Sequence, residues 1–450
     1  MMERGGDSLP ELQTFVVQLG AALNAAGEPA YTVQERLGEV ARAYGARAAR
    51  ISAFPTYLMV TMGRGEPATL ELTSVAASPR LDQIAALDRL VHEAEQGAVL
   101  PADGLRRLDE IRTMGPRFGQ WQSIVGYSIF TLGLCLLLDP APGDVAAAAV
   151  LGALVGVLRS LGRGQSPLQM MMPLAAAFVV SALSALAVKL DITDPGLQAM
   201  VASLVVFLPG AALTTAVLEL AAGQVVSGSS RLVSGVVQLA LLAFGIVAGI
   251  DAVGVPSSVV FSESARPLGG WAPWLGVLVF AVGVMMANSA PARSFPGLLV
   301  VLYAAWGGQV LGNAIFGGYV SAFVGALVMT PVAYWVSRFP SAMPSHASFL
   351  PGFWLLVPGA LGLIGFAQLA GDANAAGTED LIATVVSIFA VAVGVLCGTL
   401  LLAWASATGR LVGDVSGSLT QQRLWLGRLR TRSGDRRGPS GSDGDRRPRR

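Results

Sequence analysis

The feature that most constrains this chain is a series of ten apolar runs that begins at Trp121 and continues to about residue 407. Most of them are close to the ~20 residues that a helix needs to cross the hydrocarbon core of a bilayer. The runs cover residues 121–138, 144–161, 168–190, 195–222, 230–250, 271–288, 295–311, 314–338, 348–370 and 380–407. The sequence therefore predicts a mainly α-helical membrane protein with about ten transmembrane helices.

The ten runs divide into two sets of five. The first run begins about 150 positions before the sixth, and the second about 150 positions before the seventh, which indicates an internal repeat. An odd number of spans in each repeat inverts one half relative to the other, as in many secondary transporters. We therefore expect two inverted five-helix membrane repeats, over residues 119–255 and 256–410.

The two ends of the chain have a different, more charged composition. Helical apolar periodicity recurs in residues 1–118, and a short β-type pattern at 49–62 is interrupted by Pro55. These residues predict a soluble α+β domain with its own core. Residues 411–450 are rich in Gly, Ser, Asp and Arg, which predicts a disordered, arginine-rich cytoplasmic tail.

The loops between the runs carry charges in an alternating pattern that predicts orientation. Arginines occupy every second loop, whereas acids predominate in the others. The loops expected inside contain Arg159, Arg163, Arg231, Arg293, Arg338 and Arg410. Because positive charge favours the cytoplasmic side, both termini are expected in the cytoplasm, and the protein is expected in a bacterial cytoplasmic (inner) membrane.

Two of the apolar runs contain a proline–glycine pair near the middle. Pro209-Gly210 and Pro358-Gly359 are 149 positions apart, which is the spacing of the repeat. Proline removes a backbone donor and clashes with the preceding turn, so each pair should break its helix. A single break of this kind is more often a packing kink. A matched pair in the two halves instead indicates a transport site.

Few polar side chains lie inside the runs. Glu219 follows Pro209 by ten positions, roughly 15 Å along a helix, and is a candidate for proton coupling; the alternative is an interfacial acid paired with Arg231 or Arg159. Its counterpart in the second half would be Gln368, which does not titrate. Thr214 and Thr215 follow the first break by one turn and could contact a ligand or a neighbouring carbonyl.

Other functional classes find little support. The phosphate-binding pattern G-x-x-x-x-G-K-[ST] is missing from the sequence, which argues against an ATP-driven pump. His92 and His346 are the only histidines, so we expect no metal centre, no cofactor and no catalytic residues. A net charge of +1 gives no indication of nucleic-acid binding.

Arg159 at the end of the second run is expected to reach toward the membrane interface, and Gln309 is expected to bridge helices.

These residues together resemble the threonine/serine exporter family. The resemblance covers roughly residues 12–408 and rests on Gly27, Val33-Gln34-Glu35, Leu37, Tyr44-Gly45, Leu208-Pro209-Gly210, Glu219, Gly223, Ser227-Gly228, Arg231 and Pro358-Gly359. The chain departs from the family pattern at Gln34, where an acid is expected. Some relatives are split into two membrane subunits implicated in dicarboxylate (succinate) export, whereas this chain carries both halves.

The resemblance implies a secondary exporter of threonine and serine driven by the proton gradient. An amino-acid zwitterion would fit between two broken helices, because the N–H end of one half-helix suits a carboxylate and the C=O end of another suits an ammonium group. The expected substrate-binding residues are Pro209, Gly210, Thr214, Thr215, Pro358 and Gly359. The alternatives are a dicarboxylate exporter and a membrane-anchored sensor or scaffold. The expected partners are an amino acid and the lipid bilayer, with homo-oligomerisation left open.

Overall fold

The computed structural model describes residues 8–62, 69–72, 79–162, 166–192, 197–260, 268–339, 341–356 and 374–407. Met1–Gly398 forms one compact unit and Thr399–Arg450 a second. The predicted tail at 411–450, the second proline–glycine pair and Gln368 lie outside the described residues.

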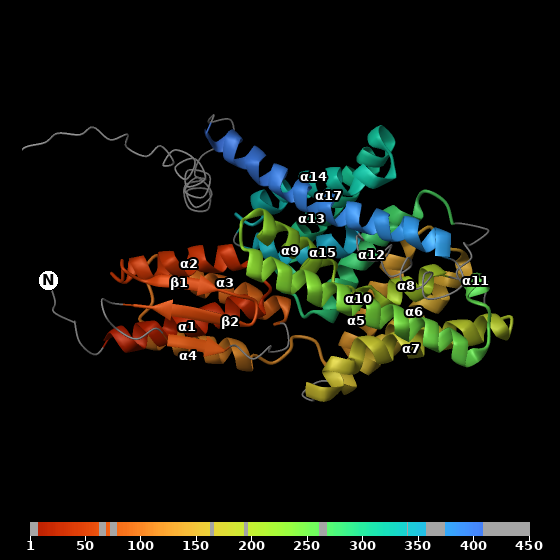
Figure 1. Cartoon of the computed structure of the whole chain (residues 1–450), viewed down its shortest axis with the longest axis horizontal. Coiled ribbons are helices and arrows are strands. Elements are labelled where there is room, and N and C mark those ends of the chain that lie inside the picture. Colours follow the sequence, from red (N-terminus) through yellow and green to blue (C-terminus); the bar gives the residue numbers. More distant parts are fainter. Residues whose placement is uncertain are drawn as a thin grey trace, which may run out of the picture. The chain divides into compact units, whose positions relative to one another are not determined.

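The amino-terminal region combines four helices with a small antiparallel sheet (Figure 1). Its elements are α1 (Ser8–Ala25), α2 (Ala30–Ala43), β1 (Arg50–Ala53), β2 (Tyr57–Thr61), β3 (Thr69–Leu72), α3 (Leu81–Glu95) and α4 (Pro101–Thr113). The predicted split of the β pattern at Pro55 is confirmed, because Phe54–Thr56 form the turn of the β1–β2 hairpin. The third strand was not predicted.

The sheet has the order β1-β2-β3, with Ser52 opposite Met59 and Met59 opposite Leu70. A separate hydrophobic core forms within residues 12–108, from one stripe of α1 and α2 and from β2, α3 and α4. Phe15 of α1 is completely buried and fills the space beside Gly104 of α4, which no larger residue could occupy without a shift. The amphipathic patterns therefore fold as an α+β unit with its own interior.

Helices follow from residue 120 onward, and every predicted apolar run contains one. They are α5 (Gln120–Leu136), α6 (Pro142–Leu161), α7 (Ser166–Lys189), α8 (Leu197–Leu204), η1 (Val205–Phe207), α9 (Gly210–Ala221), α10 (Val225–Val253), α11 (Ser257–Val260), α12 (Ala272–Ala287), η2 (Ala292–Ser294), α13 (Phe295–Phe316), α14 (Gly318–Val336), α15 (Ser345–Leu356) and α17 (Asn374–Ala407).

Five of the described helices are long and apolar enough to cross a membrane, and the bent pair α8–η1 with α9 adds a sixth. Two shorter apolar helices, Ala272–Ala287 and Val320–Val336, accompany them. The chain is thus a multi-pass membrane protein. α15 covers only the first part of the ninth predicted run, and the remainder lies outside the described residues.

The first helices of the two predicted repeats, α5 and α12, pack closely against each other. A methyl group on Gly133 of α5 would collide with the backbone of Phe280, and one on Gly283 of α12 would collide with the backbone of Phe130. The two contacts are reciprocal, because Gly133 and Gly283 are 150 positions apart, as are Phe130 and Phe280. A contact of this kind is expected where equivalent surfaces meet around a two-fold axis.

A second helix pair occurs twice. Gly245 and Gly249 of α10 pack on Leu174, Ala177, Phe178 and Ser181 of α7, whereas Gly394 and Gly398 of α17 pack on Phe323, Ala326, Leu327 and Thr330 of α14. Each residue of the first set is 149 positions before its counterpart in the second. The loops repeat as well, since Asp139 and Ser289, 150 positions apart, both have positive φ, at 51° and 53°. Residues at the spacing of the predicted repeat therefore make equivalent contacts in these two helix pairs.

Candidate functional site

The proline–glycine pair at Pro209-Gly210 interrupts the fourth predicted span, as expected. The helix axis bends by 55° between Leu197–Phe207 and Gly210–Ala221. Leu208 has φ −69° and ψ 131°, which is the extended backbone that a following proline imposes. α9 then begins at Gly210, and its N-cap residue, Pro209, makes no side-chain capping hydrogen bond to the first turn. These N–H groups give the start of α9 a partial positive charge.

Helix α10 covers the break from one side. The side-chain amide of Gln238 donates to the carbonyl of Phe207 at 2.6 Å, which satisfies one acceptor that the break has released. Gly235 brings α10 close to Leu213 and Pro209, with a methyl at this position lying 3.6 Å from the proline ring. A broken helix inside a membrane requires cover of this kind, because lipid offers no hydrogen bonds.

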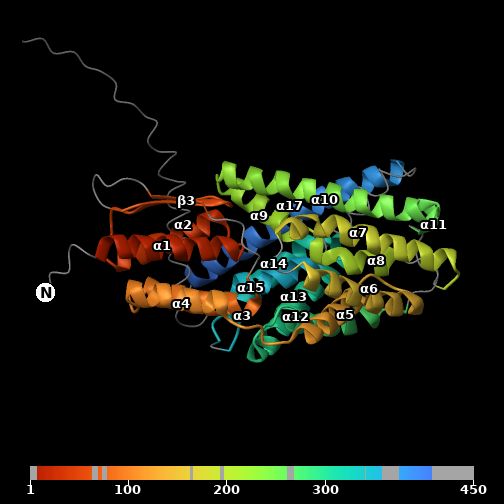
Figure 2. The ribbon, with the colours of Figure 1, turned by 90° about the horizontal axis from the view of Figure 1, so that it is seen from below.

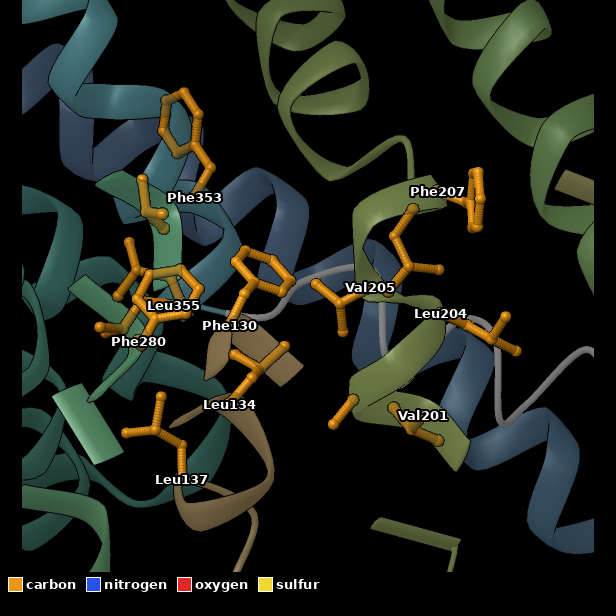
Figure 3. Close-up of a cluster of buried hydrophobic side chains, with 14 of the residues drawn as sticks. Phe130, Leu134, Leu137, Val201, Leu204, Val205, Phe207, Phe280, Phe353 and Leu355 are labelled. Atoms are coloured by element: carbon orange, nitrogen blue, oxygen red, sulfur yellow. The ribbon is translucent and has the colours of Figure 1, made fainter. Parts of the chain in front are cut away.

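The piece before the break belongs to the central core of the membrane region. Figure 3 shows Phe130 of α5 between Val205 on one side and Phe280 and Leu355 on the other. Phe130 lies 5.0 Å from the ring of Phe280 and 5.5 Å from that of Trp354, centroid to centroid. The helix segment before the first break therefore packs against the site where α5 and α12, the first long helices of the two predicted repeats, cross.

Thr214 and Thr215, the two threonines predicted to bind substrate, lie on α9, one turn after the break. Both are buried, and the Thr214 side chain is 0% exposed. The Thr214 hydroxyl nevertheless has no hydrogen-bond partner within the described structure, whereas Thr330 on α14 donates to the carbonyl of Ala326 at 2.8 Å. A buried hydroxyl costs free energy unless a hydrogen-bond partner satisfies it.

Glu219 lies near the end of α9 and is completely buried. Its Oε1 accepts a hydrogen bond from the backbone N–H of Ala30 at 2.8 Å, and its two oxygens lie 3.2 and 3.1 Å from Nε of Arg231. Ala30 is the first residue of α2, so the carboxylate stabilises the positive end of an amino-terminal-domain helix. The predicted pairing with Arg231 is present.

Further contacts join the start of α2 to helices of both predicted membrane repeats. Figures 1 and 2 both show α9 and α15 next to α2 and α3. Arg231 donates to the carbonyl of Glu28 at 3.3 Å, and His346 at the start of α15 lies 3.5 Å from the carboxylate of Glu28. The start of α2 and the preceding Glu28 thus contact α9, α10 and α15.

Glu28 also belongs to a charged cluster around Arg36. A guanidinium nitrogen of Arg36 lies 3.0 Å from both Glu28 and Asp88, and Nε lies 2.9 Å from Glu95. Burial alone would lower the pKa of Arg36, but the three carboxylates raise it above its usual value. Ligand atoms of Glu28, Asp88 and His346 all lie within 4.8 Å of one another, as in a metal site. Arg36 already supplies the positive charge that a metal ion would bring to these carboxylates. We therefore interpret the cluster as part of the contact between the amino-terminal domain and the membrane region, not as a metal site.

Gln34, the position where an acid was expected, has a role at the same junction. Its side-chain carbonyl accepts a hydrogen bond from Gln224 at 3.3 Å, just before α10. Its amide donates to the carbonyl of Ala53 in β1, also at 3.3 Å. An amide can accept and donate at once, whereas an ionised acid could only accept.

The comparisons with known proteins agree with this architecture. The family model described as "Putative threonine/serine exporter" (ThrE) matches residues 14–253, which is more than half of the chain. The chain belongs to the threonine/serine exporter family. The matched region contains the amino-terminal domain, the break at Pro209-Gly210 and the Glu219–Arg231 pair, so the resemblance identified from the sequence is confirmed there.

The curated relatives of this exporter-family chain include two fungal proteins named "Pheromone-regulated membrane protein 10". The one from Debaryomyces hansenii is 24% identical over 361 residues, covering 77% of this chain and 35% of its own length. The one from Yarrowia lipolytica is 21% identical over 399 residues, covering 84% and 32%. The chain thus spans about a third of the length of these relatives. No solved structure matches it.

The sequence analysis gave Arg159 an interfacial role and Gln309 a helix-bridging role, and it did not name Trp306 of this exporter-family protein. Arg159 of α6 was expected at the interface, but its guanidinium lies over the rings of Tyr127 and Phe207. The side-chain carbonyl of Gln309 and the indole N–H of Trp306, both on α13, are buried without partners in the described structure. The exact repeat spacing of 150 between Arg159 and Gln309 could have revealed the first two from the sequence.

Proposed function

We propose that the protein is a secondary active exporter of small polar amino acids, with threonine and serine as substrates and the proton-motive force as the energy source. The observation that carries this proposal is the break at Pro209-Gly210, where a membrane helix starts with uncapped N–H groups at the core of the bundle. Family membership supports export as the direction and a small molecule as the substrate.

The substrate would lie where the two broken helices approach each other. The first turn of α9 offers N–H donors to a carboxylate, and the hydroxyl of Thr214 is buried and free to bind. Pro209, Gly210 and Thr215 shape this end of the site. Pro358 and Gly359, outside the described residues, would form its counterpart at the end of α15, where freed carbonyls suit an ammonium group.

The proposal includes two inverted five-helix repeats, over residues 119–255 and 256–410. The reciprocal α5–α12 crossing and the matching α7–α10 and α14–α17 packing support it, because equivalent residues make equivalent contacts at offsets of 150 and 149. Alternating access would then be a movement of one repeat against the other around a fixed site.

Glu219 is proposed to carry the coupled proton. It is a buried acid in the membrane region, and such groups are expensive unless they serve a function or have a partner. Its bonds to Arg231 and to the first amide of α2 would be made when the carboxylate is ionised and weakened when it is protonated. Protonation would therefore loosen the contact between α9 and the amino-terminal domain.

The cellular setting is proposed from the arginines in alternate loops of the sequence. We place the protein in a bacterial cytoplasmic membrane with both termini and the amino-terminal domain inside. The ion pair at the end of α9 would then lie at the cytoplasmic mouth, which the first turn of α2 covers. The domain would control access from the cytoplasm.

Counterflow in proteoliposomes tests the proposal. Vesicles containing the purified protein and unlabelled serine should accumulate labelled serine or threonine transiently, and Gly210→Val should abolish this signal because it obstructs the backbone at the break. Gly307→Val is the matched control, since a methyl group at Gly307 in α13 meets nothing within 4 Å. Absence of serine and threonine counterflow by the wild-type protein would refute this substrate assignment.

A further inference from the structure

A groove lies where the start of α13 and the end of α14 meet. Only Gly317 separates these two helices in the chain, and they pack along each other, so they run in opposite directions. The closest approach beside the groove is at Gly297, where a methyl group would lie 2.7 Å from a methyl of Val336. The groove has a volume of about 200 Å³, and its lining includes Arg293, Gly297, Val300, Trp335, Phe339 and Ala342.

The apolar part of the groove faces outward from the membrane region. Val300 is 46% exposed, Trp335 51% and Phe339 48%. The rings of Trp335 and Phe339 contact each other edge to face, with their centroids 5.1 Å apart. Tryptophan is enriched where a membrane helix leaves the hydrocarbon core, and α13 belongs to a segment long and apolar enough to cross a membrane. The groove therefore lies at a membrane–water interface.

The outer end of the groove is positively charged. Arg293 is exposed and lies two residues before the start of α13. No acidic residue is among the described residues that line the groove, and the sequence contains no Asp or Glu between Glu263 and Asp372. Gly297, in the first turn of α13, lines the same groove, and the start of a helix carries a partial positive charge. This end of the groove therefore attracts an anion.

The groove changes from charged to apolar along the helix axes. Val300 lies five residues after the start of α13, about 7.5 Å farther into the membrane. Because α14 runs in the opposite direction, Trp335 lies deeper than Phe339, which follows the end of that helix. A phospholipid has the same order, with its phosphate at the interface and its acyl chains toward the centre of the bilayer. Basic pockets between transmembrane helices bind anionic head groups in this way.

The arginine and the two aromatic residues are specific to one half of the membrane region. Their counterparts at the repeat spacings of 150 and 149 are neither charged nor aromatic. These counterparts are Gly143 for Arg293, Leu186 for Trp335 and Leu190 for Phe339. The internal repeat therefore does not account for the charged and aromatic lining of the groove.

We propose that this groove binds an anionic phospholipid, with Arg293 against the phosphate and an acyl chain along Val300, Trp335 and Phe339. A guanidinium can donate two parallel hydrogen bonds to a phosphate. A free phosphate has the same charge but would leave the apolar end of the groove uncovered. The site is separate from the broken helix at Pro209-Gly210 and does not depend on which substrate is transported.

Photo-crosslinking on the full chain in phosphatidylcholine vesicles tests the site. Two probes are compared, phosphatidylglycerol and phosphatidylcholine, each with a diazirine in one acyl chain, and labelled peptides are identified by mass spectrometry. The phosphatidylglycerol probe should label the peptide that contains Trp335 and Phe339 about fivefold more, which is the preference that one arginine near an anionic lipid provides. Glycerol phosphate in excess has the phosphate but no acyl chains, and it should not compete.

Arg293→Gln should bring the ratio of the two labelling yields close to one, and the fold should be kept because Arg293 is exposed. Arg338→Gln is the matched control. Arg338 is also exposed and precedes Phe339, but it is not among the residues that line the groove, so this variant should keep the preference. Equal labelling by the two probes in the wild-type protein, or an equal loss in both variants, would overturn the proposal. Competition by glycerol phosphate would identify a soluble phosphate compound as the ligand and would overturn the assignment to a lipid.

Discussion

Glu219→Gln is the substitution that separates transport chemistry from structure most directly. The carboxylate is completely buried, and it accepts from Ala30 and from Arg231, whose side chain is 15% exposed. Glutamine has nearly the same shape and keeps an oxygen that can accept from Ala30. It removes the negative charge that balances Arg231.

The magnitude follows from those contacts. A hydrogen bond to a charged group contributes about 1.5–3 kcal/mol, against about 0.5–1.5 kcal/mol for a neutral one. Only the bond from Ala30 becomes neutral on both sides, whereas Arg231 keeps its charge and loses the carboxylate that balances it, so Glu219→Gln should weaken the junction between α9 and α2 by about 2–3 kcal/mol. Glu219→Ala removes both bonds and leaves Arg231 unpaired, for which about 3–5 kcal/mol is expected.

The assay combines two transport measurements with one measurement of the junction. If Glu219 carries the proton, Glu219→Gln should abolish export driven by a pH gradient and leave serine counterflow largely intact. Hydrogen exchange at the start of α2 reports how far the junction has loosened, because Ala30 donates directly to Glu219.

Arg231→Gln is the control for the structural role. It breaks the same ion pair from the other side but keeps the carboxylate. If Glu219 acts only as a structural contact, both variants should show the same loosening and the same loss of export. Gradient-driven export at the wild-type rate in Glu219→Gln would refute a role in coupling.

Three further predictions concern orientation, the repeat and the amino-terminal domain. A cysteine at the exposed Gly143 should react with an impermeant thiol reagent from outside the cell and one at Arg293 only after permeabilisation; external labelling of Arg293→Cys would contradict the inverted topology. Gly245→Val and Gly394→Val should each lower the thermal midpoint in detergent by a similar amount, because both glycines meet an alanine side chain and a carbonyl at equivalent places, and a large difference would argue against equivalent repeats. The hydrogen bond from Arg107 lowers the pKa of Glu93 in the folded protein. The Glu93–Arg107 pair therefore contributes its full stabilisation of the fold above the ordinary glutamate pKa, and this stabilisation is lost as the pH falls through the lowered pKa. After allowance for solvent screening of this partly exposed pair, Glu93→Gln should cost about 0.5 kcal/mol at pH 7 and less at pH 3, as measured by thermal unfolding, and an equal cost at both pH values would contradict the assignment.

Local patterns in the sequence predicted most of the helices and two of the three strands. Apolar runs of spanning length predicted where the membrane helices lie, and Pro209 predicted the break because its geometry acts on the residues next to it. Pro55 likewise separated β1 from β2. β3 was missed because a strand of four residues has too short a pattern to recognise, and it is defined by its pairing with β2.

The partners of the functional side chains depended on tertiary structure. The sequence identified Glu219 and offered Arg231 as a partner, since the two are 12 positions apart, but not the amide of Ala30, 189 positions away. It placed Arg159 at the end of a span, where reaching for water is the usual behaviour, whereas the packing of α5, α6 and η1 holds the guanidinium between two buried rings. Periodicity and turn chemistry act over a few residues, and so the sequence shows them. Which helix faces which, and therefore which buried polar atom has a partner, is determined by packing between segments far apart in the chain.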